Sequence, residues 1–245
     1  MPASISLRRA LVTGGSGELG GAIAQALAGG GYHVIVHANR SLHRAEAVVG
    51  EIVAGGGSAQ ATAFDVSDAE VTRAALDVLL GEGCIHAVVN NAGIHDDAPM
   101  AGMSSEQWHR VIDVSLHGFF NVTQPLLLPM ARARFGRIVS ISSVAALLGN
   151  RGQTNYAAAK AAMHGASKSL AREMASRGIT VNVVAPGVIE GRMADAAFPP
   201  ERIRELVPAQ RAGTPEEVAA LVAFLCSEAA GYINGQVIGV NGGMA

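Results

Sequence analysis

Charge is scarce in this sequence, since only 16% of its 245 residues are Asp, Glu, Lys or Arg. Eighteen basic side chains against twenty acidic ones give a formal net charge of −2 and leave no basic surplus. Proteins that bind nucleic acids rely on such a surplus to neutralise phosphates. The composition therefore argues against a duplex or single-strand binder.

Cysteines and long apolar runs are also few. Cys84 and Cys226 lie far apart, without CxxC spacing and among apolar or small neighbours, so we interpret both as buried small side chains. Neither a disulfide nor a metal site is expected. The longest uncharged stretch, residues 19–39, contains polar residues and three consecutive glycines, which argues against a membrane span. Residues 1–9 lack the apolar core of a secretory signal, and we expect a cytoplasmic protein.

Short apolar runs alternate with longer alanine-rich segments along the chain. The runs predict strands at residues 10–12, 34–36, 59–63, 87–89, 137–141, 180–184 and 237–240. The segments between them predict helices at 19–28, 44–54, 68–80, 106–135, 155–176 and 215–227. Such alternation predicts an α/β fold, a Rossmann-type doubly wound parallel sheet of about seven strands with helices on both faces. No linker or repeat divides residues 1–245, so one domain is expected.

A glycine-rich turn follows the first run and opens a helix. It reads Thr13-Gly14-Gly15-Ser16-Gly17-Glu18-Leu19-Gly20. Glycines at this place let the backbone approach a pyrophosphate, although a strand-to-helix turn without a ligand has the same pattern. The second strand ends in Asn39-Arg40 without an acid, which favours a 2′-phosphate and hence NADP(H). An exposed arginine at a helix start is the alternative for Arg40.

Tyrosine and lysine are rare enough for their spacing to carry information. The chain has three tyrosines and two lysines, and Lys160 follows Tyr156 by four residues in an alanine-rich helix. Composition alone gives this spacing roughly once in forty such chains. A cation one turn away would lower the pKa of the phenol, whereas a surface contact is the alternative. Ser143 ends the fifth strand, where a hydroxyl can orient a substrate carbonyl. Together these groups indicate hydride transfer to a ketone.

These motifs resemble the short-chain dehydrogenase/reductase family, and within it most closely the 3-oxoacyl-acyl-carrier-protein reductases, from Arg9 to Met244. The similarity extends to Asp65-Val66, Asn90-Asn91-Ala92-Gly93, Pro186-Gly187 and Val240-Asn241-Gly242-Gly243.

The resemblance implies a role for each matching residue. Tyr156 would be the general acid, Lys160 would bind the nicotinamide ribose and lower the tyrosine pKa, and Ser143 would hold the carbonyl. Ser115 would hold a water of a proton relay. Residues 190–211 would form a mobile substrate lid. The cofactor would contact Gly14, Ser16, Gly17, Leu19, Gly20, Asn39, Arg40, Asp65, Val66, Asn91, Ala92, Gly93, Tyr156, Lys160, Pro186, Gly187 and Ile189.

The resemblance also implies partners. Arg134 and Arg177 match positions that contact an acyl carrier protein in relatives, and Arg132 and Arg137 would add positive charge beside Arg134. Solvated helix-end arginines are the alternative. A homotetramer built on the helices at 106–135 and 155–176 is expected.

Three positions depart from the family pattern. Glu18 stands where a glycine is usual, and we expect its carboxylate to face solvent and cofactor affinity to be weakened. Ser115 replaces an asparagine and has a shorter reach toward water. Gly191 lacks the threonine hydroxyl that relatives often offer to the carboxamide.

The leading hypothesis is an NADPH-dependent oxidoreductase that reduces a 3-oxoacyl thioester, carried on a carrier protein, in fatty-acid or polyketide-like biosynthesis. A reductase or dehydrogenase of a free ketone, alcohol or sugar is the first alternative, and a non-catalytic NADP-binding partner subunit is the second. Substrate selection would fall to residues 95–103, to the lid, and to Leu147, Leu148, Asn150 and Gln153. His95, Asp96 and Asp97 would contact substrate or solvate a loop.

Overall fold

Seven parallel strands form one sheet in a computed structural model that describes residues 7–191 and 199–245. The sheet order is β3-β2-β1-β4-β5-β6-β7, as the doubly wound prediction requires. The strands are β1 (Arg9–Val12), β2 (His33–Ala38), β3 (Ser58–Ala63), β4 (Ile85–Asn90), β5 (Gly136–Ile141), β6 (Ile179–Pro186) and β7 (Val237–Val240). The α-helices are α1 (Glu18–Gly29), α2 (Leu42–Ala54), α3 (Ala69–Gly81), α4 (Ser105–Ile112), α5 (Gly118–Ala133), α6 (Ala145–Leu148), α7 (Thr154–Met174), α9 (Pro200–Leu206) and α10 (Pro215–Cys226).

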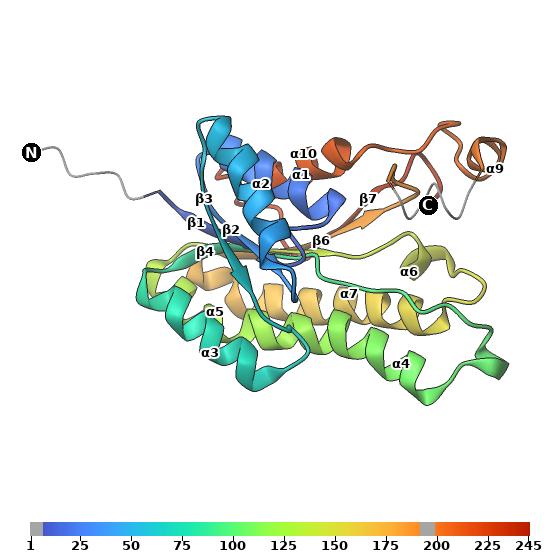
Figure 1. Cartoon of the computed structure of the whole chain (residues 1–245), viewed down its shortest axis with the longest axis horizontal. Helices are drawn as coiled ribbons and strands as arrows, with labels where there is room; N and C mark the ends of the chain where they lie inside the picture. The colour runs from blue at the N-terminus through green and yellow to red at the C-terminus, as the bar shows by residue number, and fades with distance from the viewer. Residues whose placement is uncertain (1–6, 192–198) are drawn as a thin grey trace, which may run out of the picture.

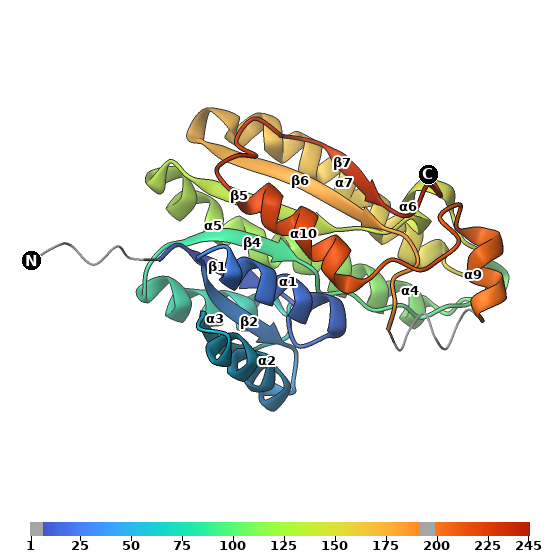
Figure 2. The ribbon, with the colours of Figure 1, turned by 90° about the horizontal axis from the view of Figure 1, so that it is seen from above.

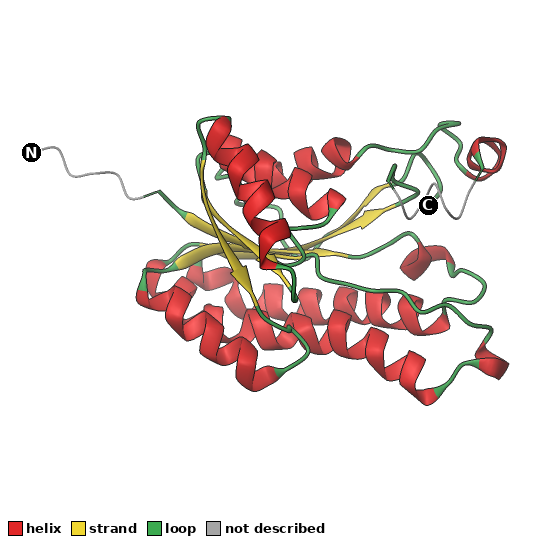
Figure 3. Cartoon of the chain, viewed as in Figure 1, coloured by secondary structure: helices red, strands yellow, loops and turns green. Residues whose placement is uncertain are grey.

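The sheet lies between two layers of helices, with α1, α2 and α10 on one face and α3, α4, α5 and α7 on the other (Figures 1 and 3). Successive residues of each strand alternate between the two layers. In β1, Ala10 and Val12 pack with Ile23 of α1, whereas Leu11 packs with Leu126 of α5. Because both faces are covered, the central strands β1, β4, β5 and β6 are buried at nearly every position, which is why the sequence shows runs rather than alternation there.

The strand order reverses between β1 and β4, which lie side by side at the centre of the sheet (Figure 2). Ligands of doubly wound sheets bind beyond the carboxyl ends of the strands at such a switch point. The loops that follow β1, β4, β5 and β6 all meet at this edge, because the strands are parallel.

The predicted helix at 106–135 is interrupted, so this prediction was wrong in detail. A π-helical turn, η2 (Asp113–His117), separates α4 from α5. The second helix ends at Ala133 because Arg134 adopts a left-handed conformation with φ of 52°. A π turn inserts one residue without ending the helix, and the hydrophobic period therefore did not show it.

Several short elements were not predicted, namely α6, α9 and the 3₁₀ turns η1 (Met100–Gly102) and η3 (Ala175–Arg177). Their few residues give no usable period. Cys226 is fully buried, as expected, and Cys84 is half-buried; neither forms a disulfide. Within the part of the chain that the structure describes, no helix has the length and apolarity needed to cross a membrane.

Candidate active site

The glycine turn and the loop after β4 are held together by Thr13. Its hydroxyl accepts the backbone N–H groups of Asn91 and Ala92, each at 3.0 Å, and the Asn91 side-chain amide donates to the Thr13 carbonyl at 2.9 Å. Gly14 has φ of +63°, and a Cβ there would lie 3.1 Å from the Ala92 Cα. A side chain at Gly20 would overlap the Gly14 carbonyl. This close packing puts the N-terminus of α1 at the switch point, and a helix N-terminus favours an anion.

His37 also holds this turn, and sequence reasoning did not assign it a role. Its buried ring accepts the Gly14 N–H at Nδ1, at 3.1 Å, and its Nε2 donates to the Phe64 carbonyl at 2.8 Å. Burial lowers the pKa of His37 to about 4, so the ring is neutral near pH 7. The imidazole thereby connects the glycine turn to the loop that carries Asp65. The only sequence feature that could have indicated this role is the position of His37 near the end of β2.

Two arginines lie near the glycine turn, Arg40 directly after β2 and Arg44 in α2. Asn39 and Arg40 are exposed directly after β2, and the Arg44 guanidinium donates to the Ser16 carbonyl at 3.4 Å. The Ser67 hydroxyl and N–H hold the pKa of Asp65 below its usual range, and the charge of Arg40 lowers it further. The sequence analysis did not select Arg44 as a cofactor contact, because the pattern around it indicated only the start of a helix.

Ser143, Tyr156 and Lys160 converge beyond the carboxyl end of β5. Tyr156 and Lys160 are one turn apart near the start of α7, and the Lys160 Nζ lies 5.6 Å from the Tyr156 ring centre. The same Nζ donates to the Ile141 carbonyl at 2.8 Å. The Ser143 hydroxyl accepts the Ala145 N–H at 3.1 Å, which fixes it at the start of α6.

Burial is the main influence on the pKa values of Tyr156 and Lys160. It lowers the pKa of Lys160 to about 8 and raises the pKa of Tyr156, although the Ser143 hydroxyl acts in the opposite direction on the phenol. The prediction that Lys160 lowers the tyrosine pKa stays a prediction. With a raised pKa, the Tyr156 phenol carries its proton at neutral pH.

The π turn η2 carries Ser115 to the same place. Among the described residues, the buried Ser115 hydroxyl has no hydrogen-bond partner. A Cβ on Gly93 would lie 3.1 Å from the Lys160 Nζ and 3.7 Å from the Ser115 Oγ. The three residues thus enclose a space that only glycine leaves open, and a polar ligand or water would satisfy the hydroxyl.

Asn155 positions the tyrosine and was not assigned a role from the sequence. It is fully buried, its side-chain oxygen accepts the Tyr156 N–H at 2.8 Å, and its amide donates to the carbonyls of Asp96 and Gln107 at 3.0 and 3.1 Å. A polar residue at the start of an alanine-rich helix is ordinary in sequence, so only the fold reveals this role.

The next strand of the sheet, β6, ends at Pro186, and Gly187 and Ile189 follow it at the same edge. The Pro186 carbonyl accepts the Val144 N–H at 2.7 Å, beside Ser143, and the Gly187 N–H donates to Val240 at 2.9 Å. A Cβ on Gly187 would approach the Asn241 Cα to 2.8 Å. These contacts place the predicted carboxamide-binding segment next to Ser143, one of the predicted catalytic residues.

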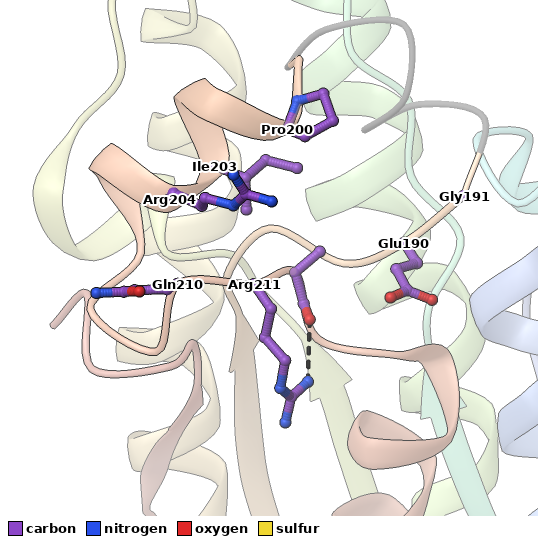
Figure 4. A pocket seen from close by; sticks show the side chains of 8 residues that line it. Glu190, Gly191, Pro200, Ile203, Arg204, Gln210 and Arg211 are labelled. Carbon is purple, nitrogen blue, oxygen red and sulfur yellow. Dashed lines mark hydrogen bonds between the residues drawn. The ribbon is translucent and has the colours of Figure 1, made fainter.

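The expected lid borders a cleft of about 540 Å³ (Figure 4). Glu190 and Gly191 line one side of it, and α9 and the segment after it line the other. Arg211 forms an ion pair with Glu217 at 2.6 Å that anchors the far end of the segment. Residues 192–198 of the predicted lid lie outside the described residues.

The loop at 95–103 is tied to the segment after α6. The Ala98 N–H donates to Gly152 at 2.9 Å, and Gln153 donates to Asp97 at 2.8 Å. Asp96 accepts Gln107 at 2.8 Å and pairs with Arg110 at 3.3 Å. Both carboxylates, of Asp96 and Asp97, therefore bind side chains that flank the loop. Met100, Leu147 and Leu148 expose large apolar side chains on these segments.

The proposed docking arginines lie at the opposite end of the molecule from Tyr156. Arg134 donates to Ser176 at 3.5 Å, so it is close to Arg177, which follows α7. Since α7 has 21 residues, this places them about 30 Å from Tyr156 of the same chain. Arg137 is not part of this surface: it is buried, stacks on Phe135 at 4.2 Å and donates to backbone carbonyls.

Comparisons with known proteins agree with this geometry. A family model described as enoyl-(acyl carrier protein) reductase matches residues 16–245. The 3-oxoacyl-[acyl-carrier-protein] reductase FabG of Aggregatibacter actinomycetemcomitans is 45% identical over 239 residues, covering 96% of this chain and 98% of that protein. The enzyme of the same name from Staphylococcus aureus (strain Mu50) is 45% identical over 240 residues, covering 97% and 98%. The 3-oxoacyl-[acyl-carrier-protein] reductase of Synechocystis is 43% identical over 243 residues, covering 98% of each chain.

Proposed function

The chain belongs to the short-chain dehydrogenase/reductase family, and from its active-site geometry we propose that it is an NADPH-dependent 3-oxoacyl-[acyl-carrier-protein] reductase. The observation that carries the proposal is the convergence of Ser143, Tyr156 and Lys160 beside the glycine turn of a seven-stranded parallel sheet. Relatives that carry this activity match nearly the whole chain.

The residues of the site support a ketone reduction. When bound, the nicotinamide cofactor supplies the hydride. Ser143 donates its hydroxyl hydrogen to the substrate carbonyl, and Tyr156 protonates the carbonyl oxygen as negative charge develops there. The Tyr156 phenol is protonated at neutral pH, so its proton is available for transfer to the carbonyl oxygen. Lys160 holds the ribose hydroxyls, and the space beside Ser115 admits the water that returns a proton to the tyrosine.

The cofactor proposal rests on the fit of the residues at the switch point. Gly14 and Gly20 let the turn pack closely, since a Cβ would meet the Ala92 Cα at the first and the Gly14 carbonyl at the second. The N-terminus of α1, at this turn, suits a diphosphate. Arg40 and Arg44 stand where a 2′-phosphate would need a counter-charge. NADP(H) is therefore proposed rather than NAD(H).

The substrate proposal is a thioester on an acyl carrier protein. The exposed apolar side chains of Met100, Leu147 and Leu148 supply a surface for an acyl chain. If the carrier docks at Arg134 and Arg177, those arginines are too far from Tyr156 of their own chain for the carrier's arm to reach it. A carrier docked there would serve another copy, which accords with the proposed homotetramer. We also propose a cytoplasmic location.

The first test is NADPH oxidation with a short 3-oxoacyl thioester, presented on CoA and on a carrier protein, for wild type and Tyr156→Phe. Loss of the phenol proton donor is expected to lower kcat at least a hundredfold while NADPH still binds. A 2-enoyl thioester and a free ketone serve as comparison substrates. Turnover that survives in the variant, or bound NADPH without any turnover, would contradict the proposal and favour a non-catalytic subunit. Faster turnover of the free ketone would favour the alternative substrate class.

A further inference from the structure

His164 lies on the same face of α7 as Tyr156 and Lys160, because the three residues follow one another at intervals of four. Its half-buried ring places Nε2 2.7 Å from the Ser142 hydroxyl. Ser142 is buried, follows the last residue of β5 and directly precedes Ser143. The helix face that carries two predicted catalytic residues is thus hydrogen-bonded to the residue next to the third.

The Ser142 hydroxyl has a second contact, with the Lys160 carbonyl at 3.2 Å. Since a carbonyl only accepts, both contacts are hydrogen bonds when the hydroxyl donates to Lys160 and accepts from the His164 Nε2–H. Burial and the charge of Lys168 lower the pKa of His164, so the ring is neutral near pH 7. His164 therefore supplies a hydrogen-bond donor one turn from Lys160 without adding a positive charge there.

The end of β5 is held by α7 through side chains and by β6 through the backbone. The Lys160 Nζ donates to the Ile141 carbonyl at 2.8 Å, and Ser142 bonds to the Lys160 carbonyl and the His164 ring. The Ser142 N–H donates to a carbonyl of β6 at 2.7 Å. The chain enters Ser143 from this fixed point. The bond between His164 and Ser142 can be removed without changing any predicted catalytic residue.

We propose that His164 is a positioning residue, whose hydrogen bond to Ser142 sets the distance between the Ser143 hydroxyl and the Tyr156 phenol. Both groups must reach one carbonyl oxygen of a bound substrate, Ser143 by donating a hydrogen bond and Tyr156 by transferring a proton. A misplacement of about 1 Å between reacting groups costs up to about a hundredfold in rate. This inference rests on the proposed function, because it requires a carbonyl between the two hydroxyls.

The test measures kcat with a short 3-oxoacyl-CoA thioester, the Kd for NADPH and Tm in variants of the full chain. His164→Leu removes the donor and keeps a large side chain in the helix, and it is expected to lower kcat about tenfold. Its Kd for NADPH should stay within about twofold of wild type. His164→Gln, whose amide can donate to Ser142, should keep kcat within about threefold of wild type. His43→Leu, the same change at an exposed histidine of α2, is the control and should behave as wild type.

A second set of variants tests whether His164 acts through Ser142. Ser142→Ala removes the acceptor of the ring and should lower kcat about as much as His164→Leu. The double variant should lose no more than Ser142→Ala alone, because the bond is already absent. Additive losses in the double variant would show that the two residues act independently and would overturn the inference.

Unchanged kcat in His164→Leu, or an equal loss in His164→Gln, would also overturn it. A parallel loss of kcat, NADPH binding and Tm would do the same, since His164 would then act through packing. If the wild type reduces a free ketone and not the thioester, only the substrate proposal fails, and kcat for the ketone tests His164 in the same way. If the wild type binds NADPH and reduces neither compound, the proposed function fails together with this inference.

Discussion

His37 illustrates how a single residue supports the site without touching the reacting atoms. Its neutral ring accepts a hydrogen bond from Gly14 and donates one to Phe64, so it needs one protonated and one unprotonated nitrogen. Protonation would turn the acceptor nitrogen into a donor that faces the Gly14 N–H. The buried ring therefore links the stability of the glycine turn to pH.

The stability of the protein should fall in acid for this reason. The folded pKa of His37 is about 4, below its ordinary value of 6.5, so the unfolded chain binds the proton first as the pH falls. A depression of this size corresponds to about 3 kcal/mol of stability, present above pH 6.5 and lost progressively toward pH 4. Melting curves should show a smaller loss of Tm between pH 6.5 and 4 for His37→Gln. His43→Gln, at an exposed histidine, should behave as wild type; an unchanged profile in His37→Gln would contradict the assignment.

At the scale of elements, the π turn η2 decides where the helix pair α4–α5 places Ser115. The extra residue in this turn places Ser115 against the space beside Gly93 and Lys160. Gly118, directly after the turn, lets the helix approach the adenine-side loop, since a Cβ there would lie 2.9 Å from the Val66 Cγ2. A local irregularity in a regular helix thus lies at both the proposed proton relay and the proposed cofactor side, and π turns are frequent at functional sites.

Removal of the Ser115 hydroxyl should separate catalysis from binding. Ser115→Ala is expected to lower kcat about tenfold, because the relay water loses a partner, with the Kd for NADPH within about twofold of wild type. Steady-state kinetics and nucleotide titration measure the two effects. Ser167→Ala, which removes another buried hydroxyl without a partner among the described residues, is the control. Equal losses in both variants would indicate a packing effect instead.

At the scale of the whole molecule, the chain separates its catalytic edge from its basic end. Parallel strands put every functional loop at their carboxyl ends, whereas Arg134 and Arg177 follow helices that run back to the other edge. About 30 Å of α7 lies between Tyr156 and Arg177. A carrier protein that uses both features must therefore contact two copies.

This arrangement predicts that a copy defective in docking and a copy defective in catalysis complement each other. The double variant Arg134→Ala/Arg177→Ala should raise the KM for a carrier-bound thioester about tenfold and leave turnover of the CoA thioester unchanged. Arg73→Ala, at an exposed arginine of α3, is the control. Mixed oligomers of this double variant with Tyr156→Phe should recover carrier-dependent turnover beyond that of either parent. A failure to recover it in proven mixed oligomers would place docking within one chain or away from these arginines.

Local patterns in the sequence were sufficient for the main features. Apolar runs indicated the seven strands because both faces of the sheet are covered, and the Tyr156–Lys160 spacing indicated a shared helix face because residues four apart always lie together. Glycine at 14, 20 and 93 could be recognised in motifs, since close backbone approach excludes other side chains. The prediction of a doubly wound, seven-stranded parallel sheet and the family prediction were both confirmed.

Only the tertiary structure decided the rest, because these features depend on residues that are distant in the chain. The closeness of Glu18 to Gly191, the two hydrogen bonds of His37 and the burial that raises the Tyr156 pKa have no local pattern. Arg137 is charged, and most arginines lie at the surface, yet its place in a central strand buries it against Phe135. The sequence by itself determined which elements form and which groups carry the chemistry. Their desolvation and partners were set by how those elements pack.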